Sequence, residues 1–383
     1  MLKTLFCSKN VLVALGVTAY FVAMLVTTQF EGVAVSLLWY STVLFGAVCG
    51  LFCRRFRLAP KEIYFIIVMV STGVLNALLV GTTSVRQQAL LVLLFLLSLM
   101  FTSEYVHEDV FFLSALLNVA LVILKFMIVG FSGNIYTTSS SNYVSVYLMY
   151  PTVIYYILCE KNGKASRSFL AIVVWVLSLL SRGRGGIIAT TVLVVGLLIV
   201  KYKNTGGAFK LLIMIIGILV LTVAVLNIER IIRVLDTSVV SEYFRQRGMR
   251  SSRTYVWSEY IERTICDFKN IIIGTDVKNV LLVQELNGNP HNSFIAVHMN
   301  NGLIMLVLVL VLFVRQITRS IRNRYYIYTI CALSMVIRSF TDSIFWPTYG
   351  TAVLFFLLFI DLKEHNHNRV IKDNKRIEFT MGD

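Results

Sequence analysis

Charged residues are scarce in this chain of 383 residues: only 14% of them are charged, whereas 57% are hydrophobic. A soluble protein carries about a quarter of charged residues, so the composition excludes an ordinary soluble domain. Runs of about 20 apolar residues, each able to cross about 30 Å of hydrocarbon, recur along the sequence. Lipid offers no partners to backbone N–H and C=O groups, so such runs form helices. The sequence therefore predicts an all-α, polytopic integral membrane protein.

The sequence also lacks the patterns of a secreted, disulfide-bonded or duplicated protein. No small-residue cleavage pattern follows the first hydrophobic segment, roughly 11–30, so we expect a retained span rather than a removed signal peptide. Only Cys266 among the six cysteines falls in the long loop described below, which indicates no disulfide framework. No internal repeat suggests a transporter built from duplicated halves. The net charge of +15 needs no nucleic-acid partner, because basic inner loops facing anionic lipid account for most of it.

The hydrophobic runs predict about 12 transmembrane helices, with one large loop between the ninth and the tenth. The expected spans are 11–29, 33–53, 62–81, 87–102, 111–131, 143–159, 168–181, 185–200, 210–227, 291–314, 325–345 and 348–362. Residues 1–227 thus hold the first nine spans, 228–290 the large loop, 291–362 the last three spans and 363–383 a polar tail. With both termini cytoplasmic, most of the 35 lysines and arginines fall on inner segments, as the positive-inside rule requires.

The largest hydrophilic stretch runs from Arg245 to Gly302, mostly within this loop. Four arginines, Arg245, Arg247, Arg250 and Arg253, stand together at its start with no acidic residue among them. The planar guanidinium binds two phosphate oxygens at once, so this window favours an anion site. A solvated basic face is the alternative, above all for Arg245 and Arg247.

A possible sugar-binding face follows these arginines. If the segment is helical, Arg253, Trp257 and Tyr260 lie on one face at spacings of four and three residues. We assign Trp257 and Tyr260 to sugar binding, because apolar sugar faces stack on indole and phenol rings. The alternative is an amphipathic helix on the bilayer, with its aromatic side chains at the level of the headgroups.

His291 and Asn292 lie where the loop re-enters the membrane. Imidazole exchanges a proton most readily near neutral pH, so His291 is a candidate general base, and a purely structural histidine is the alternative. His298 follows two turns deeper on the same face, and two histidines at this separation make a poor metal site without carboxylate or thiolate ligands. We expect His298 to be a hydrogen-bonded core residue, and we predict neither a metal nor a cofactor.

Two further groups of charges lie near the ends of predicted spans. Arg182 and Arg184 stand in a glycine-rich turn between spans seven and eight, where a helix N-terminus favours a bound anion. Anchoring of these arginines among lipid headgroups is the alternative. Arg338 and Asp342 are four residues apart near the end of span eleven, so they can form a structural ion pair on one helix face.

This pattern resembles the O-antigen polymerase and O-antigen ligase superfamily of bacterial surface-polysaccharide assembly, multi-span enzymes with a large periplasmic loop between late spans. The resemblance rests on the topology of the whole chain and on local matches: Ser181-Arg182-Gly183, Arg253 to Trp257 followed by Gly274, the spacing from Arg263 to Gly274, and His291-Asn292 followed after nine residues by Gly302. The ligase pattern continues with Gly, Thr or Tyr three residues after that glycine, where this chain has Met305. This departure favours polymerase over ligase.

The resemblance implies metal-independent glycosyl transfer, without a cofactor, from a glycan on undecaprenyl pyrophosphate at the periplasmic face of the bacterial inner (cytoplasmic) membrane. A hydroxyl of the acceptor glycan would attack the anomeric carbon, and the lipid pyrophosphate would leave. In this scheme His291 deprotonates the hydroxyl, which Asn292 helps to orient. The arginines assigned to the pyrophosphate are Arg182, Arg184, Arg250 and Arg253. Besides donor, acceptor and membrane lipid, a chain-length regulator is a possible further partner; no nucleic acid is expected.

Four functions remain open at this point, one of them a lipid-binding membrane protein without chemistry. Polymerisation of lipid-linked O-antigen repeat units, or of a related polysaccharide, is the main prediction, and transfer of the glycan to lipid A-core by a ligase is the alternative. A polysaccharide flippase is less favoured, because it would line a central cavity with charges from several spans. Here the intramembrane charges are few, chiefly Lys125, Arg338 and Asp342, and the polar groups gather on one side.

Overall fold

The computed structural model describes residues 8–130, 136, 140, 142–181, 183–203 and 252–362, and every regular element in these ranges is a helix. In chain order they are α2 (Ser8–Gln29), α3 (Val33–Cys53), α4 (Pro60–Leu79), α5 (Val85–Phe101), α6 (Glu108–Val129), α7 (Tyr143–Lys161), α8 (Phe169–Leu180), α9 (Arg184–Lys203), α13 (Ser252–Ile265), α14 (Phe268–Ile273), the 3₁₀ helix η1 (Val277–Asn279), α15 (Leu281–Glu285), α16 (Ser293–Arg322), α17 (Tyr326–Thr341) and α18 (Thr351–Phe359). The prediction of an all-α fold is confirmed for these residues. The predicted ninth span, residues 228–251 of the loop and the tail lie outside them, as do Arg182, Arg245, Arg247 and Arg250.

Among the residues that the structure describes, six helices are long and apolar enough to cross a membrane: Asn10–Gln29, Val33–Cys53, Pro60–Leu79, Glu108–Val129, Arg184–Tyr202 and Ser293–Arg322. Shorter apolar helices are Val85–Phe101, Phe169–Leu180 and Tyr326–Thr341. Large apolar side chains on their outer faces, such as Leu78 and Met127, are exposed, as expected of surfaces that face hydrocarbon. These features fit a membrane-embedded protein, while the count of twelve spans stays a prediction.

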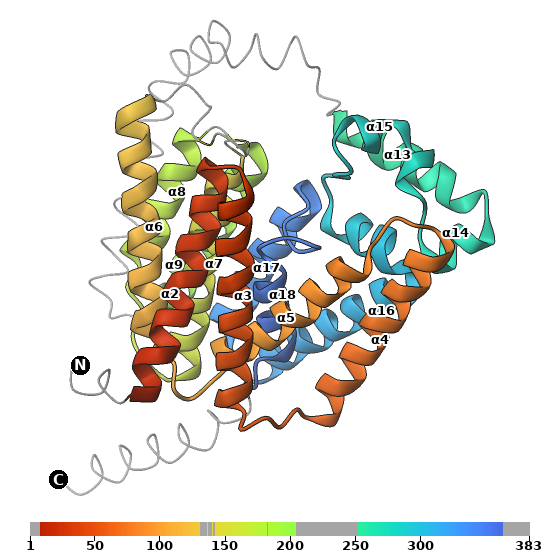
Figure 1. Ribbon diagram of the computed structural model, residues 1–383. Helices are drawn as coiled ribbons and strands as arrows, with labels where there is room; N and C mark the ends of the chain where they lie inside the picture. Colours follow the sequence, from red (N-terminus) through yellow and green to blue (C-terminus); the bar gives the residue numbers. More distant parts are fainter. Residues whose placement is uncertain are drawn as a thin grey trace, which may run out of the picture.

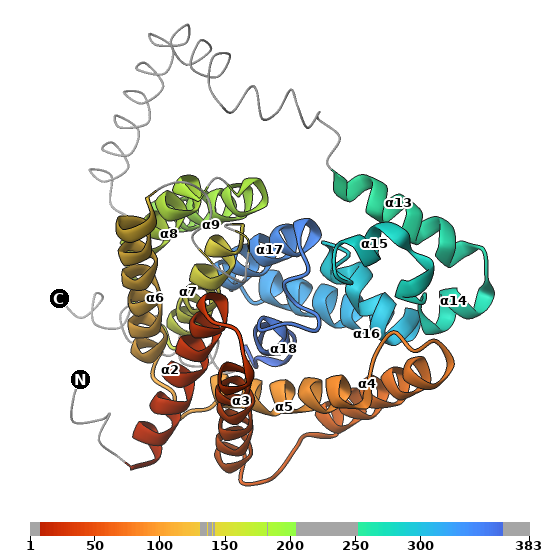
Figure 2. The same cartoon turned by 45° about the horizontal axis from the view of Figure 1, so that its top comes forward.

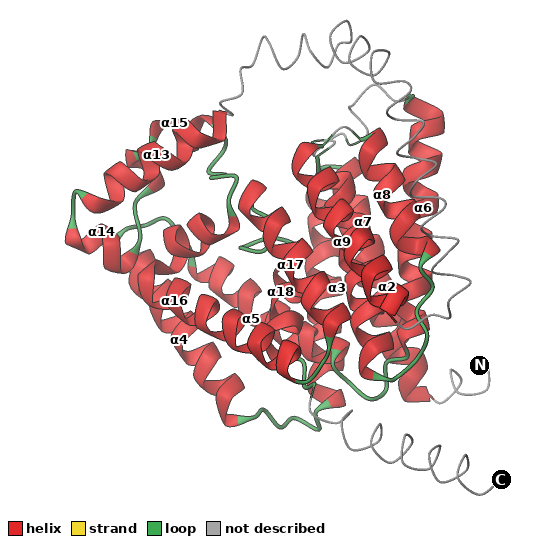
Figure 3. Ribbon diagram, turned by 180° about the vertical axis from the view of Figure 1, so that it is seen from behind, coloured by secondary structure: helices red, strands yellow, loops and turns green. Residues whose placement is uncertain are grey.

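α7 forms the centre of a helix bundle. Every residue of α7 from Val144 to Glu160 is buried, and the helix packs against α6, α8, α9 and α17. Figures 1 and 2 show α2, α3, α6, α8 and α9 grouped with α7, whereas α4, α5 and α16 run together at a slant beside this group. The short helices α13, α14 and α15 gather at one end of the slanted group, as the view from behind in Figure 3 also shows.

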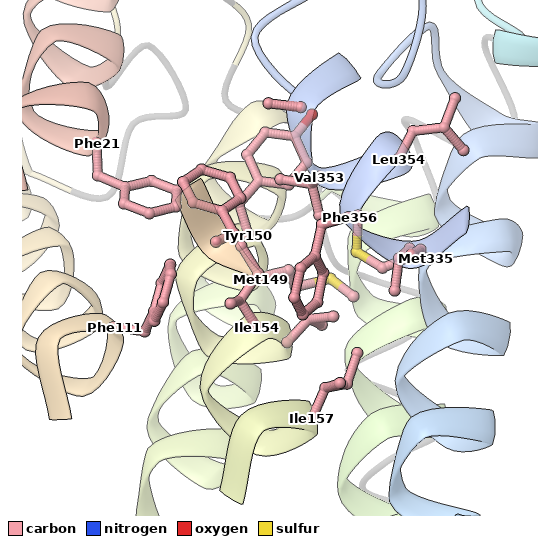
Figure 4. Close-up of a cluster of buried hydrophobic side chains, with 14 of the residues drawn as sticks. Phe21, Phe111, Met149, Tyr150, Ile154, Ile157, Met335, Val353, Leu354 and Phe356 are labelled. Atoms are coloured by element: carbon pink, nitrogen blue, oxygen red, sulfur yellow. The ribbon is translucent and has the colours of Figure 1, made fainter. Parts of the chain in front are cut away.

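Aromatic side chains from distant segments fill the core around α7. Figure 4 shows Phe21 of α2, Phe111 of α6, Tyr150 of α7 and Phe356 of α18 in this region. The rings of Phe21 and Phe111 lie 6.2 Å apart in an edge-to-face arrangement, and such a pair contributes about 0.5–1.5 kcal/mol beyond the burial of its area. Lipid is as apolar as these rings, so close packing rather than exclusion of water holds such helices together.

α16 is broken at Gly302, where the backbone has φ 72° and ψ −175°. α14 packs against the break: a Cβ atom on Gly302 would lie 2.1 Å from the carbonyl oxygen of Ile272. The side-chain amide of Asn76 in α4 donates to the carbonyl oxygens of Ile273 at 2.7 Å and Met299 at 3.1 Å. The backbone carbonyl groups around the break therefore have hydrogen-bond partners within the protein, as a backbone shielded from water requires.

Gly302→Ala is expected to destabilise the protein, because alanine disfavours this backbone conformation and its Cβ atom would collide with α14. Strain of this kind costs about 1–3 kcal/mol before the collision is counted. The midpoint of thermal unfolding in detergent should fall further for Gly302→Ala than for Gly81→Ala. Gly81 is a matched control, since its φ is +81° but no atom lies within 4 Å of its Cβ position. Equal decreases in the midpoint for the two variants would mean that the contact with α14 does not contribute to the destabilisation.

The last described helix is shorter than the sequence predicts. α18 has nine residues, which rise about 14 Å at about 1.5 Å per residue, roughly half the thickness of the hydrocarbon layer. All nine residues are buried. The predicted span 348–362 is therefore corrected to a buried helix about half as long as a membrane crossing needs. The sequence could not show this, because an apolar run has the same composition whether lipid or protein surrounds it.

Candidate active site

Asp342 is the centre of a cluster of charged and polar side chains at one end of the bundle. It directly follows α17 and is 1% exposed. Its Oδ1 atom lies 2.9 Å from Nδ1 of His291 and accepts a hydrogen bond from the hydroxyl of Tyr143 at 3.3 Å. Its Oδ2 atom lies 3.2 Å from Nη2 of Arg338 and 3.5 Å from Nη2 of Arg253. These partners compensate a carboxylate that would be costly to bury alone.

Arg338 is the structural partner of this carboxylate, as the spacing of four residues predicts. The arginine is 1% exposed. Its Nη2 atom also donates to the carbonyl oxygen of Asn142, and its Nη1 atom donates to Oγ1 of Thr341, both at 2.9 Å. Because its donors are occupied and it is shielded from solvent, Arg338 holds Asp342 in place and ties the end of α17 to the start of α7.

His291 stands just before α16 in an unusual backbone conformation for a residue with a side chain, with φ 50°. Its backbone N–H donates to Oδ1 of Asn289 at 2.9 Å, which holds the turn. With Nδ1 bonded to Asp342, the neutral ring carries its proton there and leaves Nε2 as the basic nitrogen. The side chain remains 24% exposed. An aspartate in this position orients an imidazole and stabilises the imidazolium that forms when it takes up a proton.

Asn292, predicted to orient the acceptor hydroxyl, caps a helix. Its Oδ1 atom accepts hydrogen bonds from the backbone N–H groups of Phe294 at 2.9 Å and Ile295 at 3.2 Å, and its Nδ2 atom donates to the carbonyl oxygen of Phe340 at 3.4 Å. Asparagine is among the best residues for an N-cap. Asn292 therefore fixes the start of α16, and with it the position of His291.

Two of the four arginines predicted to bind pyrophosphate, Arg253 and Arg184, lie at this cluster. Arg253 lies in the first turn of α13 and is 24% exposed. Burial lowers the pKa of the Arg253 guanidinium, the carboxylate of Asp342 raises it, and the charges of Arg338 and Arg184 lower it. Arg184 is the exposed first residue of α9. Arg338 and Arg253 beside one carboxylate, with the charge of Arg184 acting on Arg253, leave an excess of positive charge, which suits an anion.

The glycines beside Arg184 allow close packing of the start of α9. A Cβ atom on Gly185 would lie 2.2 Å from Oγ1 of Thr341, and one on Gly186 would lie 2.2 Å from Oγ of Ser145. The start of α9 can therefore press against the end of α17 and the start of α7. This contact brings Arg184 and the positive end of the α9 dipole to the cluster.

Of the two residues predicted to bind sugar, Tyr260 is buried, whereas Trp257 is partly exposed. α13 is a helix, but Tyr260 is 3% exposed and its hydroxyl lies 2.6 Å from Nδ1 of His298. The indole N–H of Trp257 donates to the carbonyl oxygen of Pro290 at 3.0 Å. Both rings pack in an apolar cluster that joins α13 to α15 and the start of α16. His298 is the hydrogen-bonded core residue that the sequence predicts.

A cavity of about 880 Å³ opens beside His291. It lies between the end of α2, the start of α3, the start of α7 and the segments 285–291 and 347–349. Its aromatic and acidic lining residues are Phe30, Trp39, Tyr40, Tyr143, Tyr147, Tyr349, Glu31 and Glu285. Sequence analysis missed them, because aromatic residues at the ends of spans are equally typical of a membrane interface.

A second polar cluster lies at the opposite end of α7. His107, Glu108 and Asp109 could together hold a metal ion by their geometry. However, Nζ of Lys164 lies 2.8 Å from Nε2 of His107 and also binds Glu108, and Asn162 donates to Glu108 at 2.9 Å. These bonds join α6 to the segment after α7, and we assign the cluster to structure.

No protein-family model matches the chain, and no curated protein matches its sequence. The functional assignment therefore depends on the geometry of the site, and the resemblance to O-antigen polymerases and ligases stays a prediction.

Proposed function

We propose that this protein is a glycosyltransferase at the outer face of the bacterial inner membrane, where it polymerises undecaprenyl-pyrophosphate-linked repeat units of O-antigen or a related polysaccharide. The observation that carries the proposal is the meeting of the His291–Asp342 pair with Arg253 and Arg184 beside an open cavity of about 880 Å³. Transfer from a pyrophosphate requires these two functions together, since a base activates the hydroxyl and cations stabilise the departing charge.

In the proposed reaction, an acceptor hydroxyl gives its proton to Nε2 of His291 while its oxygen attacks the anomeric carbon of the donor. The new glycosidic bond forms as the bond from this carbon to the pyrophosphate oxygen breaks, with inversion at the carbon. Asp342 stabilises the imidazolium, which later returns its proton to solvent. Arg253 and Arg184 stabilise the negative charge that accumulates on the pyrophosphate.

The aromatic part of the cavity suits the saccharide. Tyr349 is half-buried, and the buried ring of Trp39 supports it edge to face at 4.5 Å. A phenol ring held in this way offers an apolar face to a sugar. Glu31 and Glu285 add carboxylate oxygens that accept hydrogen bonds from sugar hydroxyls.

Tyr349→Ala is expected to raise the KM for the lipid-linked donor about five- to tenfold, which corresponds to the loss of one ring contact. Tyr349→Phe keeps the ring and should keep the KM. Tyr260→Phe is the contrasting variant: it leaves a buried nitrogen of His298 without its partner, so the midpoint of thermal unfolding should fall while the KM stays unchanged. Steady-state kinetics and thermal unfolding of the purified variants check both statements. If Tyr260→Phe raised the KM while the stability stayed unchanged, the result would support the prediction that Tyr260 binds sugar.

A ligase is the second candidate, favoured by His291-Asn292 followed after nine residues by Gly302. The two reactions use the same donor and differ in the acceptor, so the same base and arginines serve either. A flippase would move the lipid-linked unit without breaking a bond and would need no base.

The test is a glycan ladder from a null strain and from the same strain complemented with the wild-type gene. Lipopolysaccharide capped with a single repeat unit in the null would support polymerase, because ligation still proceeds. Long lipid-linked polymer together with a bare lipopolysaccharide core would support ligase. If no repeat units reached the outer face, both enzyme proposals would be wrong and the flippase would replace them.

A further inference from the structure

Lys125 carries a positive charge inside α6, four residues before that helix ends at Val129. Among the residues that the structure describes, it has neither an ion pair nor a hydrogen bond. A charge within a membrane-crossing helix is costly without a partner, and such residues often mark a binding site. The proposed reaction does not use Lys125, so its partner has to be sought elsewhere.

Lys125 lines an apolar groove of about 240 Å³ between α2 and α6. The walls of the groove are aliphatic, formed by Val22, Leu25 and Val26 of α2 and Leu121, Leu124 and Ile128 of α6. The three side chains from α6 are exposed on the outside of the bundle. The groove is therefore open to hydrocarbon, and its lining suits a lipid chain.

Two buried polar atoms at this groove point to a headgroup. The hydroxyl of Tyr136, a residue 7% exposed, and the Oε1 atom of Gln29 both lack a hydrogen-bond partner in the described part of the chain. Both residues line the groove. Buried polar groups in proteins normally have a partner. The phenol can donate and the amide oxygen can accept, so a matching ligand has an anionic oxygen for Lys125 and Tyr136 and a hydroxyl for Gln29.

We propose that this groove binds an anionic phospholipid with a hydroxylated headgroup, of which phosphatidylglycerol is the simplest form. The phosphate contacts Lys125 and the hydroxyl of Tyr136, the glycerol hydroxyl donates to Gln29, and one acyl chain lies between α2 and α6. Phosphatidylethanolamine fits less well, because its headgroup brings a second cation to Lys125. Among their described lining residues, the groove and the cavity beside His291 share only Phe30, so the proposal does not depend on the proposed reaction.

Native mass spectrometry of the delipidated full-length protein, given equal amounts of phosphatidylglycerol and phosphatidylethanolamine with the same chains, tests the proposal. The wild type should retain phosphatidylglycerol preferentially. Lys125→Met should bind it about five- to tenfold more weakly, as expected for the loss of one cation near an anionic headgroup. Tyr136→Phe and Gln29→Leu should each weaken binding, whereas Lys61→Met, at an exposed position in the first turn of α4, should bind like the wild type.

Leu121→Trp separates the acyl-chain site from the charge, because it fills the groove while Lys125 remains. This variant should lose the lipid, with its folding verified by circular dichroism. Wild-type retention by Lys125→Met or by Leu121→Trp would overturn the proposal, and so would equal retention of the two lipids by the wild type. Inorganic phosphate has no acyl chain and should not compete. Competition by phosphate would mean a site for a free anion and would also overturn it.

Discussion

His291→Ala is expected to extend the glycan about 10²- to 10⁴-fold more slowly than the wild type, the usual contribution of a positioned general base. The reason is that His291 lines the cavity while Asp342 holds its Nδ1 atom at 2.9 Å. The measurement is the rate of chain extension by purified protein in lipid nanodiscs, supplied with a polyprenyl-pyrophosphate-linked repeat unit. His107→Ala, at the opposite end of α7, is the matched control and should keep the wild-type rate. Full activity of the His291→Ala enzyme would contradict the assignment of His291 as the general base.

Asp342→Asn tests whether the carboxylate acts through the imidazole. If it does, the double variant His291→Ala/Asp342→Asn should be no slower than His291→Ala alone, because residues that act as one unit have non-additive effects. Asp342→Asn also removes the counter-charge of buried Arg338, so thermal unfolding has to accompany the kinetics. If the two substitutions lowered the rate additively while the folded fraction stayed unchanged, Asp342 would have a role separate from that of His291.

The positions of most described helices follow from hydrophobicity alone. The predicted span 33–53 coincides with α3, and the predicted 143–159 lies within α7. Length and apolar composition decide these elements, because a backbone in lipid has no alternative to the helix. The break at Gly302 and the half-length α18 could not be predicted in the same way. Both depend on what packs beside the chain, and the break in particular on the backbone of α14.

In the site, too, local contacts could be predicted from the sequence and distant contacts could not. Arg338 and Asp342 could be paired from the sequence because four residues place two side chains on one helix face. The partnership of His291 with Asp342 joins residues 51 positions apart, and only the packing of α16 against α17 brings them together. Tyr260 shows the limit of helix periodicity: the spacing gave the correct face of α13, but that face turns toward His298 rather than toward a ligand.

Arg253→Ala is expected to slow glycosyl transfer about 10²- to 10³-fold, the usual loss when one preorganised group that stabilises transition-state charge is removed. Arg253→Lys should restore only part of the rate, because an ammonium group lacks the planar fork that binds two phosphate oxygens. Arg263→Ala, at an exposed position near the other end of α13, is the matched control and should behave like the wild type.

Inhibition by inorganic pyrophosphate separates a binding role of Arg253 from a structural one. If the guanidinium binds the leaving group, pyrophosphate should inhibit the wild type and Arg263→Ala but inhibit Arg253→Ala much more weakly. If Arg253 only balanced the charge of Asp342, its removal would lower the midpoint of thermal unfolding and leave inhibition unchanged. Arg338 alone already pairs with that carboxylate at 3.2 Å, closer than the 3.5 Å of Arg253. Arg253, which is 24% exposed whereas Arg338 is 1% exposed, is therefore the arginine whose charge remains available to an anion.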